Sequence, residues 1–135
     1  MVPTQVLSTA SPRSPIVLLV DDDADTLDMY EIGLTAVGFR PLTTRDGSSV
    51  SRQVDAVCPD VVVTDLQLQG TSGWVVVESL RRNAKGRTIP VVLLTGSSSP
   101  QIDRQAQELG CAAVVMKPCT PDELGEVLRQ VLTTS

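Results

Sequence analysis

The chain has 135 residues and a formal net charge of −5, and it contains no histidine. This length fits one domain with a proper hydrophobic core, and an acidic chain without a basic stripe is a poor candidate for direct nucleic-acid binding. The lack of histidine excludes a Ser/His/Asp triad, a histidine-ligated metal and a phosphohistidine on this chain.

The beginning of the chain differs in composition from the rest. Residues 1–14 contain prolines, serines and threonines and have no apolar core of the signal-peptide kind. We expect a flexible arm over residues 1–14 and one folded domain over residues 15–135. No apolar run approaches the ~20 residues of a membrane-spanning helix, so no membrane contact is expected. Three cysteines without metal-ligand spacing indicate reduced thiols in a cytoplasmic protein.

Five short apolar runs have the composition of buried strands. The run IVLLV ends in three aspartates, and the run VVVT ends in Asp65. Uninterrupted β-branched runs of this kind suit strands buried on both faces of a parallel sheet. The run that contains Pro41 is expected at the sheet edge, because proline cannot donate to a strand ladder. The expected strands are at residues 16–20, 39–44, 61–64, 89–94 and 112–116.

Five amphipathic segments alternate with these runs. After the first run, apolar residues recur at helical spacing up to Gly38, which supplies the stop. The other helices are expected at residues 46–57, 74–84 and 100–109 and from Pro121 onward, with Thr120 as the cap of the last one. In the 46–57 helix, the expected buried face is Val50, Val54 and Val57.

A basic cluster lies at the end of the 74–84 helix. Its members are Arg81, Arg82, Lys85 and Arg87. Cations are favoured at helix carboxyl ends, so we prefer a solvated helix face to a site for an anionic partner.

Strands that alternate with helices predict an α/β fold with a doubly wound parallel sheet. Right-handed crossovers leave few topologies, and the strand order 2-1-3-4-5 agrees with Pro41 at one edge. The expected architecture is flavodoxin-like, with three layers of helices, sheet and helices.

Chemically active residues follow four of the expected strands at the same edge of the sheet. They are Asp21, Asp22, Asp65, Thr95 and Lys117. Taken alone, an aspartate such as Asp65 is more often a turn or cap residue, but neighbouring strands ~4.8 Å apart bring all five side chains together. Crowded carboxylates need a proton or a cation, and all-oxygen ligands select Mg²⁺, with Mn²⁺ as an alternative. Such a site is equipped to form an aspartyl phosphate.

Four motifs carry a resemblance to a known family. VLLVDDD, PDVVVTDLQLQGTSGW, IPVVLLTG and VVMKP, in this order within residues 15–132, resemble the receiver domains of bacterial response regulators. The resemblance implies that Asp65 accepts phosphate from a sensor histidine kinase or a histidine phosphotransfer protein. Such a domain is a phosphoacceptor signalling protein with at most slow autodephosphorylation, and not an enzyme.

The resemblance also implies a role for each site residue. Asp22 and Asp21 would bind Mg²⁺ together with Asp65 and the backbone carbonyl of Gln67. Thr95 would turn inward to bond the phosphoryl group. Lys117 would pair with Asp65 before transfer and with phosphate after it. A cis Lys117-Pro118 bond, frequent in the family, is expected here as well.

The chain departs from the family pattern at Val114 and Gln69. Val114 stands where many relatives have an aromatic ring that rotates with the hydroxyl switch, so output is expected through backbone shifts in the serine-rich loop or through a weaker switch. Gln69 stands at a frequent proline position, which favours a less rigid loop. Gln67 and Ser97 occupy positions that tune the phosphate lifetime in the family.

With no effector domain in the sequence, we expect a stand-alone regulator that signals to an unidentified downstream protein, as a monomer or a phosphorylation-dependent dimer. The resemblance places output on the fourth helix, fifth strand and fifth helix (Ile102, Gln105, Val114) and phosphodonor contact at the start of the first helix (Thr26, Met29). Two alternatives remain. One is an unphosphorylated binding scaffold, and the other is an Asp-nucleophile phosphatase, against which Gln67 argues because it replaces the second catalytic aspartate.

Overall fold

The computed structural model describes residues 14–134, so the predicted arm lies outside the described residues except for Ser14. The strands of the main sheet are β1 (Ile16–Val20), β2 (Arg40–Thr44), β3 (Val61–Asp65), β6 (Val91–Thr95) and β7 (Ala113–Met116). The α-helices are α2 (Ala24–Ala36), α3 (Val50–Val57), α4 (Gly73–Arg82), α5 (Pro100–Glu108) and α6 (Pro121–Thr134). Two short 3₁₀ turns, η1 (Gly47–Ser49) and η2 (Gly86–Thr88), and a small hairpin, β4 (Gln67–Leu68) with β5 (Thr71–Ser72), complete the described elements.

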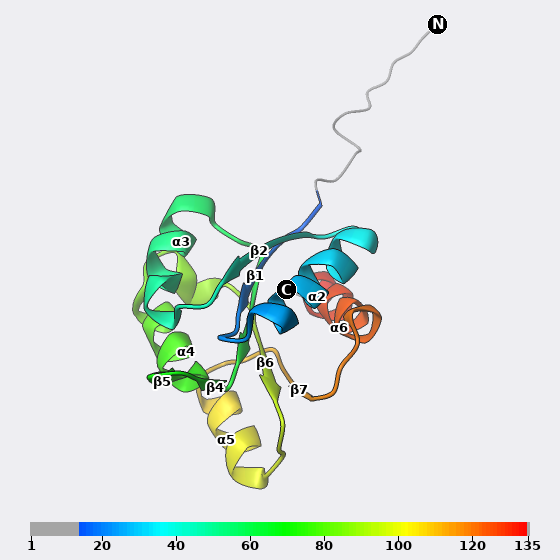
Figure 1. Ribbon diagram of the computed structural model, residues 1–135. Helices are drawn as coiled ribbons and strands as arrows, with labels where there is room; N and C mark the ends of the chain where they lie inside the picture. The colour runs from blue at the N-terminus through cyan, green and yellow to red at the C-terminus, as the bar shows by residue number, and fades with distance from the viewer. Residues whose placement is uncertain (1–13, 135) are drawn as a thin grey trace, which may run out of the picture.

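The five long strands form one parallel sheet in the order β2-β1-β3-β6-β7, between two layers of helices (Figure 1). The predicted fold class and strand order are confirmed, with β6 and β7 as the fourth and fifth predicted strands. The strand with Pro41 lies at one edge, as expected. None of the helices in residues 14–134 has the length and apolar character needed to cross a membrane.

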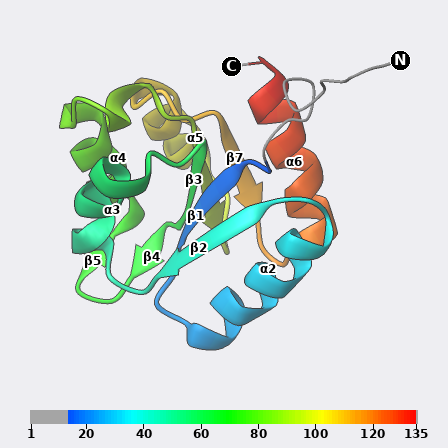
Figure 2. The ribbon, with the colours of Figure 1, turned by 90° about the horizontal axis from the view of Figure 1, so that it is seen from above.

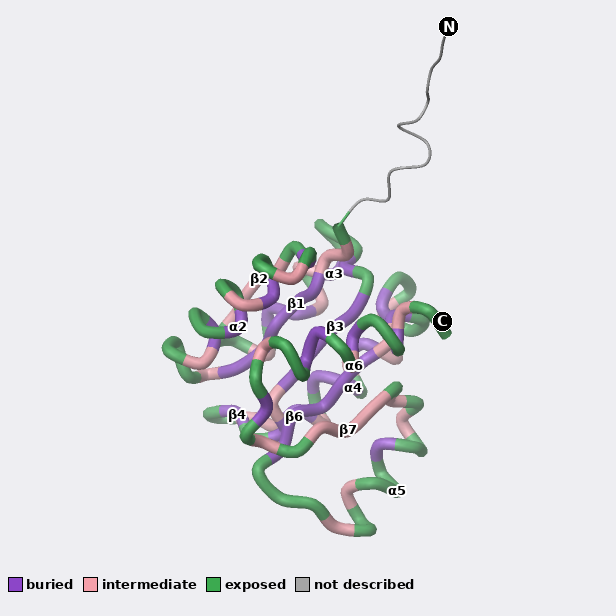
Figure 3. Tube along the Cα trace, turned by 90° about the vertical axis from the view of Figure 1, so that its right-hand side faces the viewer, coloured by how far each residue is buried: buried purple, intermediate pink, exposed green. Residues whose placement is uncertain are grey.

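Each central strand divides its side chains between two apolar cores, which is why its sequence is apolar without interruption. In β1, Val17 and Leu19 pack into the core under α2 and α6, whereas Leu18 and Val20 pack into the core under α3, α4 and α5. Figure 2 shows these two helical layers on opposite sides of the sheet. Figure 3 shows that burial is concentrated in the central strands, whereas the helices alternate between buried and exposed positions.

The structure corrects the predicted second helix. Residues 46–57 begin with the 3₁₀ turn η1, because the Asp46 side chain accepts from the Ser48 amide and holds the chain in a tight turn before α3. Val57, which was expected in the core, is 39% exposed. Cys58 follows it with a left-handed backbone (φ 53°) that ends the helix.

Local signals at other element ends were more reliable. The Thr120 hydroxyl accepts from the Glu123 amide, and the Glu123 carboxylate accepts from the Thr120 amide, which confirms the predicted cap of α6. The helix expected at residues 74–84 begins one residue earlier at Gly73 and ends at Arg82. The loop expected between β3 and this helix contains the hairpin β4–β5.

Candidate functional site

The carboxyl ends of four parallel strands bring the predicted site residues to one edge of the sheet. Asp21 directly follows β1, Asp65 ends β3, Thr95 ends β6 and Lys117 directly follows β7. The Lys117 amide donates to the Thr95 carbonyl at 2.8 Å, which continues the pairing of β6 with β7 up to the site.

An ion pair connects the two sides of this edge. Lys117 Nζ lies 2.9 Å from Asp65 Oδ2 and 3.5 Å from Asp21 Oδ2. The Lys117 side chain is 30% exposed and that of Asp65 is 13% exposed, so solvent screens the pair only in part. Burial alone would lower the pKa of Lys117, but the hydrogen bond to Asp65 and the charges of Asp21 and Asp65 outweigh it and raise that pKa. The ammonium therefore stays charged at neutral pH.

Asp21 is the most buried acid of the site, at 4% exposure. Its Oδ1 accepts from the Asp23 amide at 2.9 Å, whereas its Oδ2 accepts no hydrogen bond from the described residues. Burial raises the pKa of Asp21, although the Asp23 amide and the Lys117 charge oppose the increase. A buried carboxylate oxygen without a hydrogen-bond donor is costly; the Lys117 charge at 3.5 Å reduces that cost, and a metal ion bound to the oxygen would reduce it further.

The acids at this edge have the arrangement of a cation site. One carboxylate oxygen from each of Asp21, Asp22 and Asp65 lies within 4.8 Å of the other two. Oxygen donors of this kind suit a hard cation such as Mg²⁺. The Oδ2 atom of Asp21, which accepts no hydrogen bond from the described residues and has the Lys117 ammonium 3.5 Å away, fits the same interpretation. The backbone amide of Gln67, an exposed residue of β4, donates to Asp65 Oδ1 at 3.2 Å.

Thr95 is 3% exposed, and its hydroxyl is already engaged. Thr95 Oγ1 donates to the Ser97 carbonyl at 2.8 Å and accepts from the Ser97 amide at 3.2 Å. The exposed loop after β6 therefore holds the hydroxyl that was expected to meet a phosphoryl group. Val114 is half-buried against the core under α3, α4 and α5, so the structure has an aliphatic side chain and no aromatic ring at this position.

Gly73 is important for the site because it has no side chain. A Cβ at this position would lie 2.5 Å from the Asp65 carbonyl oxygen and 2.9 Å from Leu66 Cα. The Gly73 amide donates to the Leu66 carbonyl at 2.8 Å. The first turn of α4 thus packs directly on the backbone of the acidic strand end. The sequence showed a glycine in a loop, but nothing in it indicated this close approach.

An apolar hollow of about 460 Å³ lies beside the site. Thr26, Met29 and Tyr30 of α2 line one side, and residues 117–121 line the other. The Tyr30 hydroxyl donates to the Cys119 carbonyl at 2.6 Å and ties the two sides together. The Lys117-Pro118 bond is cis, as expected.

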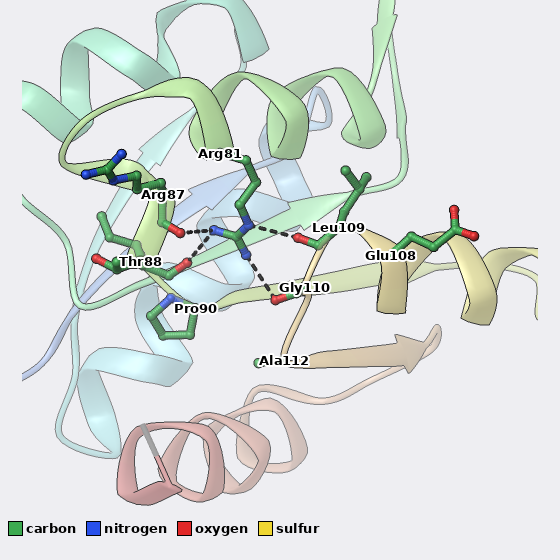
Figure 4. Close-up of a pocket in the computed structure, with 9 residues that line it drawn as sticks. Arg81, Arg87, Thr88, Pro90, Glu108, Leu109, Gly110 and Ala112 are labelled. Atoms are coloured by element: carbon green, nitrogen blue, oxygen red, sulfur yellow. Dashed lines mark hydrogen bonds between the residues drawn. The ribbon is translucent and has the colours of Figure 1, made fainter.

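A second hollow, of about 590 Å³, lies at the amino-terminal ends of β6 and β7, away from the site (Figure 4). The Arg81 guanidinium lies in it and donates to the carbonyls of Leu109, Gly110 and Ile89 at 2.8, 3.1 and 3.0 Å. Arg81 therefore links the end of α5 to the start of β6. It is not part of a solvated helix face, contrary to the prediction. Because these donors are used by backbone oxygens, Arg81 is poorly suited to hold an anionic ligand.

Comparison with known sequences identifies a family for this arrangement. A profile of the response regulator receiver domain matches residues 17–129. The phosphate regulon transcriptional regulatory protein PhoB of Klebsiella pneumoniae is 32% identical over 116 residues, which cover 86% of this chain and 51% of that protein. The transcriptional regulatory protein PrrA of Mycobacterium leprae is 36% identical over 111 residues, which cover 82% of this chain and 47% of that protein. The chain thus spans about half the length of either regulator.

Solved structures support the same relationship. The chemotaxis protein CheY4 of Vibrio cholerae superimposes with a TM-score of 0.84 at 25% identity, over 88% of this chain and 99% of that one. A putative response regulator from Chloroflexus aurantiacus superimposes with a TM-score of 0.82 at 25% identity, over 90% of this chain and 99% of that one.

Proposed function

Because the chain belongs to the response regulator receiver domain family of two-component signalling, we propose that Asp65 accepts a phosphoryl group from a phosphohistidine. The donor class is a sensor histidine kinase or a histidine phosphotransfer protein. The observation that carries the proposal is the contact of Lys117 Nζ with Asp65 Oδ2 at 2.9 Å, beside an acidic cluster in which Asp21 Oδ2 has no hydrogen-bond donor among the described residues.

In the proposed reaction, one carboxylate oxygen of Asp65 attacks the phosphorus atom. The phosphorus–nitrogen bond of the phosphohistidine breaks, its electron pair returns to the imidazole, and an aspartyl phosphate forms. Lys117 offsets the negative charge of the phosphoryl oxygens. Asp21, Asp22, Asp65 and the Gln67 carbonyl would hold Mg²⁺, which supplies Lewis-acid stabilisation of the same charge when bound.

Thr95 is proposed to respond to the new phosphoryl group. Its hydroxyl would leave the Ser97 carbonyl and donate to a phosphoryl oxygen, which is a stronger acceptor because it is charged. With Val114 in place of a ring, the change would reach the surface through the backbone of residues 96–99. We propose that output then passes by protein contacts through α5, β7 and α6, and that the hollow beside α2 faces the phosphodonor.

The direct test is phosphorylation by acetyl phosphate with Mg²⁺, followed by intact mass measurement. The wild-type chain should gain one phosphoryl group, and Asp65→Asn should gain none. Asp28→Asn is a matched control because it removes one exposed carboxylate from the middle of α2, and it should be modified like the wild type. Removal of Mg²⁺ with a chelator should also prevent modification.

Two results would contradict the proposal. Absence of any adduct on the wild-type chain would favour an unphosphorylated binding scaffold. Continuous release of inorganic phosphate at many turnovers per chain would favour a phosphatase.

A further inference from the structure

Arg45 contacts the acidic edge from a strand that contributes no acid to it. This residue directly follows β2, and its side chain is exposed. Its Nε donates to the backbone carbonyl of Asp22 at 3.1 Å. The Arg45 side chain is exposed, so its Nε could bond to water instead. The fold therefore does not need this contact to satisfy a buried donor.

The contact of Arg45 continues through one peptide group to the carboxylate of Asp21. The Asp22 carbonyl and the Asp23 amide belong to the same peptide group, and that amide donates to Asp21 Oδ1 at 2.9 Å. The guanidinium, the peptide group and the carboxylate therefore form one chain of hydrogen bonds, in which each bond polarises and strengthens the next. With Oδ1 held in this way, Oδ2 of Asp21 is the oxygen that remains 3.5 Å from Lys117 Nζ.

The turn that carries Arg45 is itself fixed by hydrogen bonds. Asp46 Oδ1 accepts from both the amide and the hydroxyl of Ser48, at 3.0 and 2.7 Å. The Asp46 carbonyl accepts from the amide and hydroxyl of Ser49. One residue before Arg45, the Thr44 carbonyl accepts from the Asp21 amide at 3.2 Å. Asp21 and Asp22 are thus attached to this turn at two neighbouring residues, Thr44 and Arg45.

We propose that Arg45 is a positioning residue for the acidic pair, because it fixes the Asp22–Asp23 peptide group and thereby keeps Asp21 and Asp22 in place for a divalent cation. The inference rests on the proposed function in so far as the acids bind Mg²⁺. Two effects of Arg45 on that cation have opposite signs. Its charge repels Mg²⁺, whereas its hydrogen bond orders the ligands, and the proposal is that ordering dominates.

The test is a Mg²⁺ titration followed by backbone amide NMR, without any phosphodonor. Arg45→Ala should weaken Mg²⁺ binding by roughly three- to tenfold, which corresponds to the loss of one net hydrogen bond. The Asp23 amide resonance should also shift in the Mg²⁺-free protein, since its peptide group loses a donor. Arg104→Ala, which removes one exposed positive charge from α5, should bind Mg²⁺ like the wild type.

Unchanged or tighter Mg²⁺ binding by Arg45→Ala would overturn the proposal, because the charge would then outweigh the bond. Weaker binding together with a lowered urea midpoint in the absence of Mg²⁺ would also overturn it, since the residue would then act on the fold as a whole. The outcome is separable from the phosphoacceptor proposal. If the wild type binds Mg²⁺ but forms no acetyl phosphate adduct, only that proposal fails. A wild type that binds no Mg²⁺ refutes both.

Discussion

Gly73→Ala should destabilise the protein and disturb the acidic strand end at the same time. The new Cβ would lie 2.5 Å from the Asp65 carbonyl oxygen and 2.9 Å from Leu66 Cα. Favourable contacts between carbon atoms begin at ~3.5 Å, so α4 or the end of β3 has to move by roughly 1 Å. Overpacking of this kind costs about 1–3 kcal/mol, and the better helix propensity of alanine returns at most ~1 kcal/mol.

Urea unfolding measures the net effect, which we expect to be about 1–2 kcal/mol. With a urea dependence of ~1–3 kcal/mol per molar, the midpoint should fall by about 0.3–2 M. Gly96→Ala is the matched control because it also lies at this edge, directly after β6, and a Cβ there would have no neighbour within 4 Å. If Gly73→Ala unfolds at or above the midpoint of Gly96→Ala, the close approach of α4 to Asp65 does not exist as described. Retention of wild-type Mg²⁺ affinity by Gly73→Ala would refute its role at the site.

Two further predictions concern stability. Cys58→Gly should raise the free energy of unfolding by about 0.5–1 kcal/mol, because Cys58 is exposed and has a left-handed backbone that glycine adopts without strain, and an unchanged or lower urea midpoint would refute this. Burial raises the pKa of Tyr30 from 10.0 to about 12, so the stability contributed by its hydroxyl is fully present below pH 10 and is lost as the pH rises toward 12. The difference in unfolding free energy between wild type and Tyr30→Phe should therefore shrink over that interval, and a difference that stays constant would contradict the reasoning.

The sheet and the position of the site were predictable from local patterns. Continuous apolar runs identified strands buried on both faces, and Pro41 identified an edge. The handedness of crossovers left few topologies, and the order that agrees with Pro41 at an edge is the one observed. The order then placed Asp21, Asp65 and Lys117 at one edge, because residues that follow parallel strands meet there.

What sequence reasoning missed depends on hydrogen bonds between segments that are far apart in the chain. Nothing near Arg45 indicates that its side chain reaches Asp22, 23 residues earlier. Arg81 read as a solvated helix end, but its donors bond carbonyls 8 and 28 residues later. For both arginines the deciding partner is set by the tertiary fold. Val57 is a separate case with a local cause, because it is the last residue of α3 and the left-handed backbone of Cys58 ends the helix directly after it.

The proline in β2 also affects whether a strand from another molecule can pair with the edge of this sheet. The Arg40 amide donates to the Pro15 carbonyl on the β1 side, so the missing amide of Pro41 belongs to the outer side of the strand. Pro41 therefore removes no hydrogen bond within the sheet, but it removes one donor from the exposed outer side of β2. A foreign strand added there would find an incomplete ladder, which protects the protein from growth by sheet extension and aggregation.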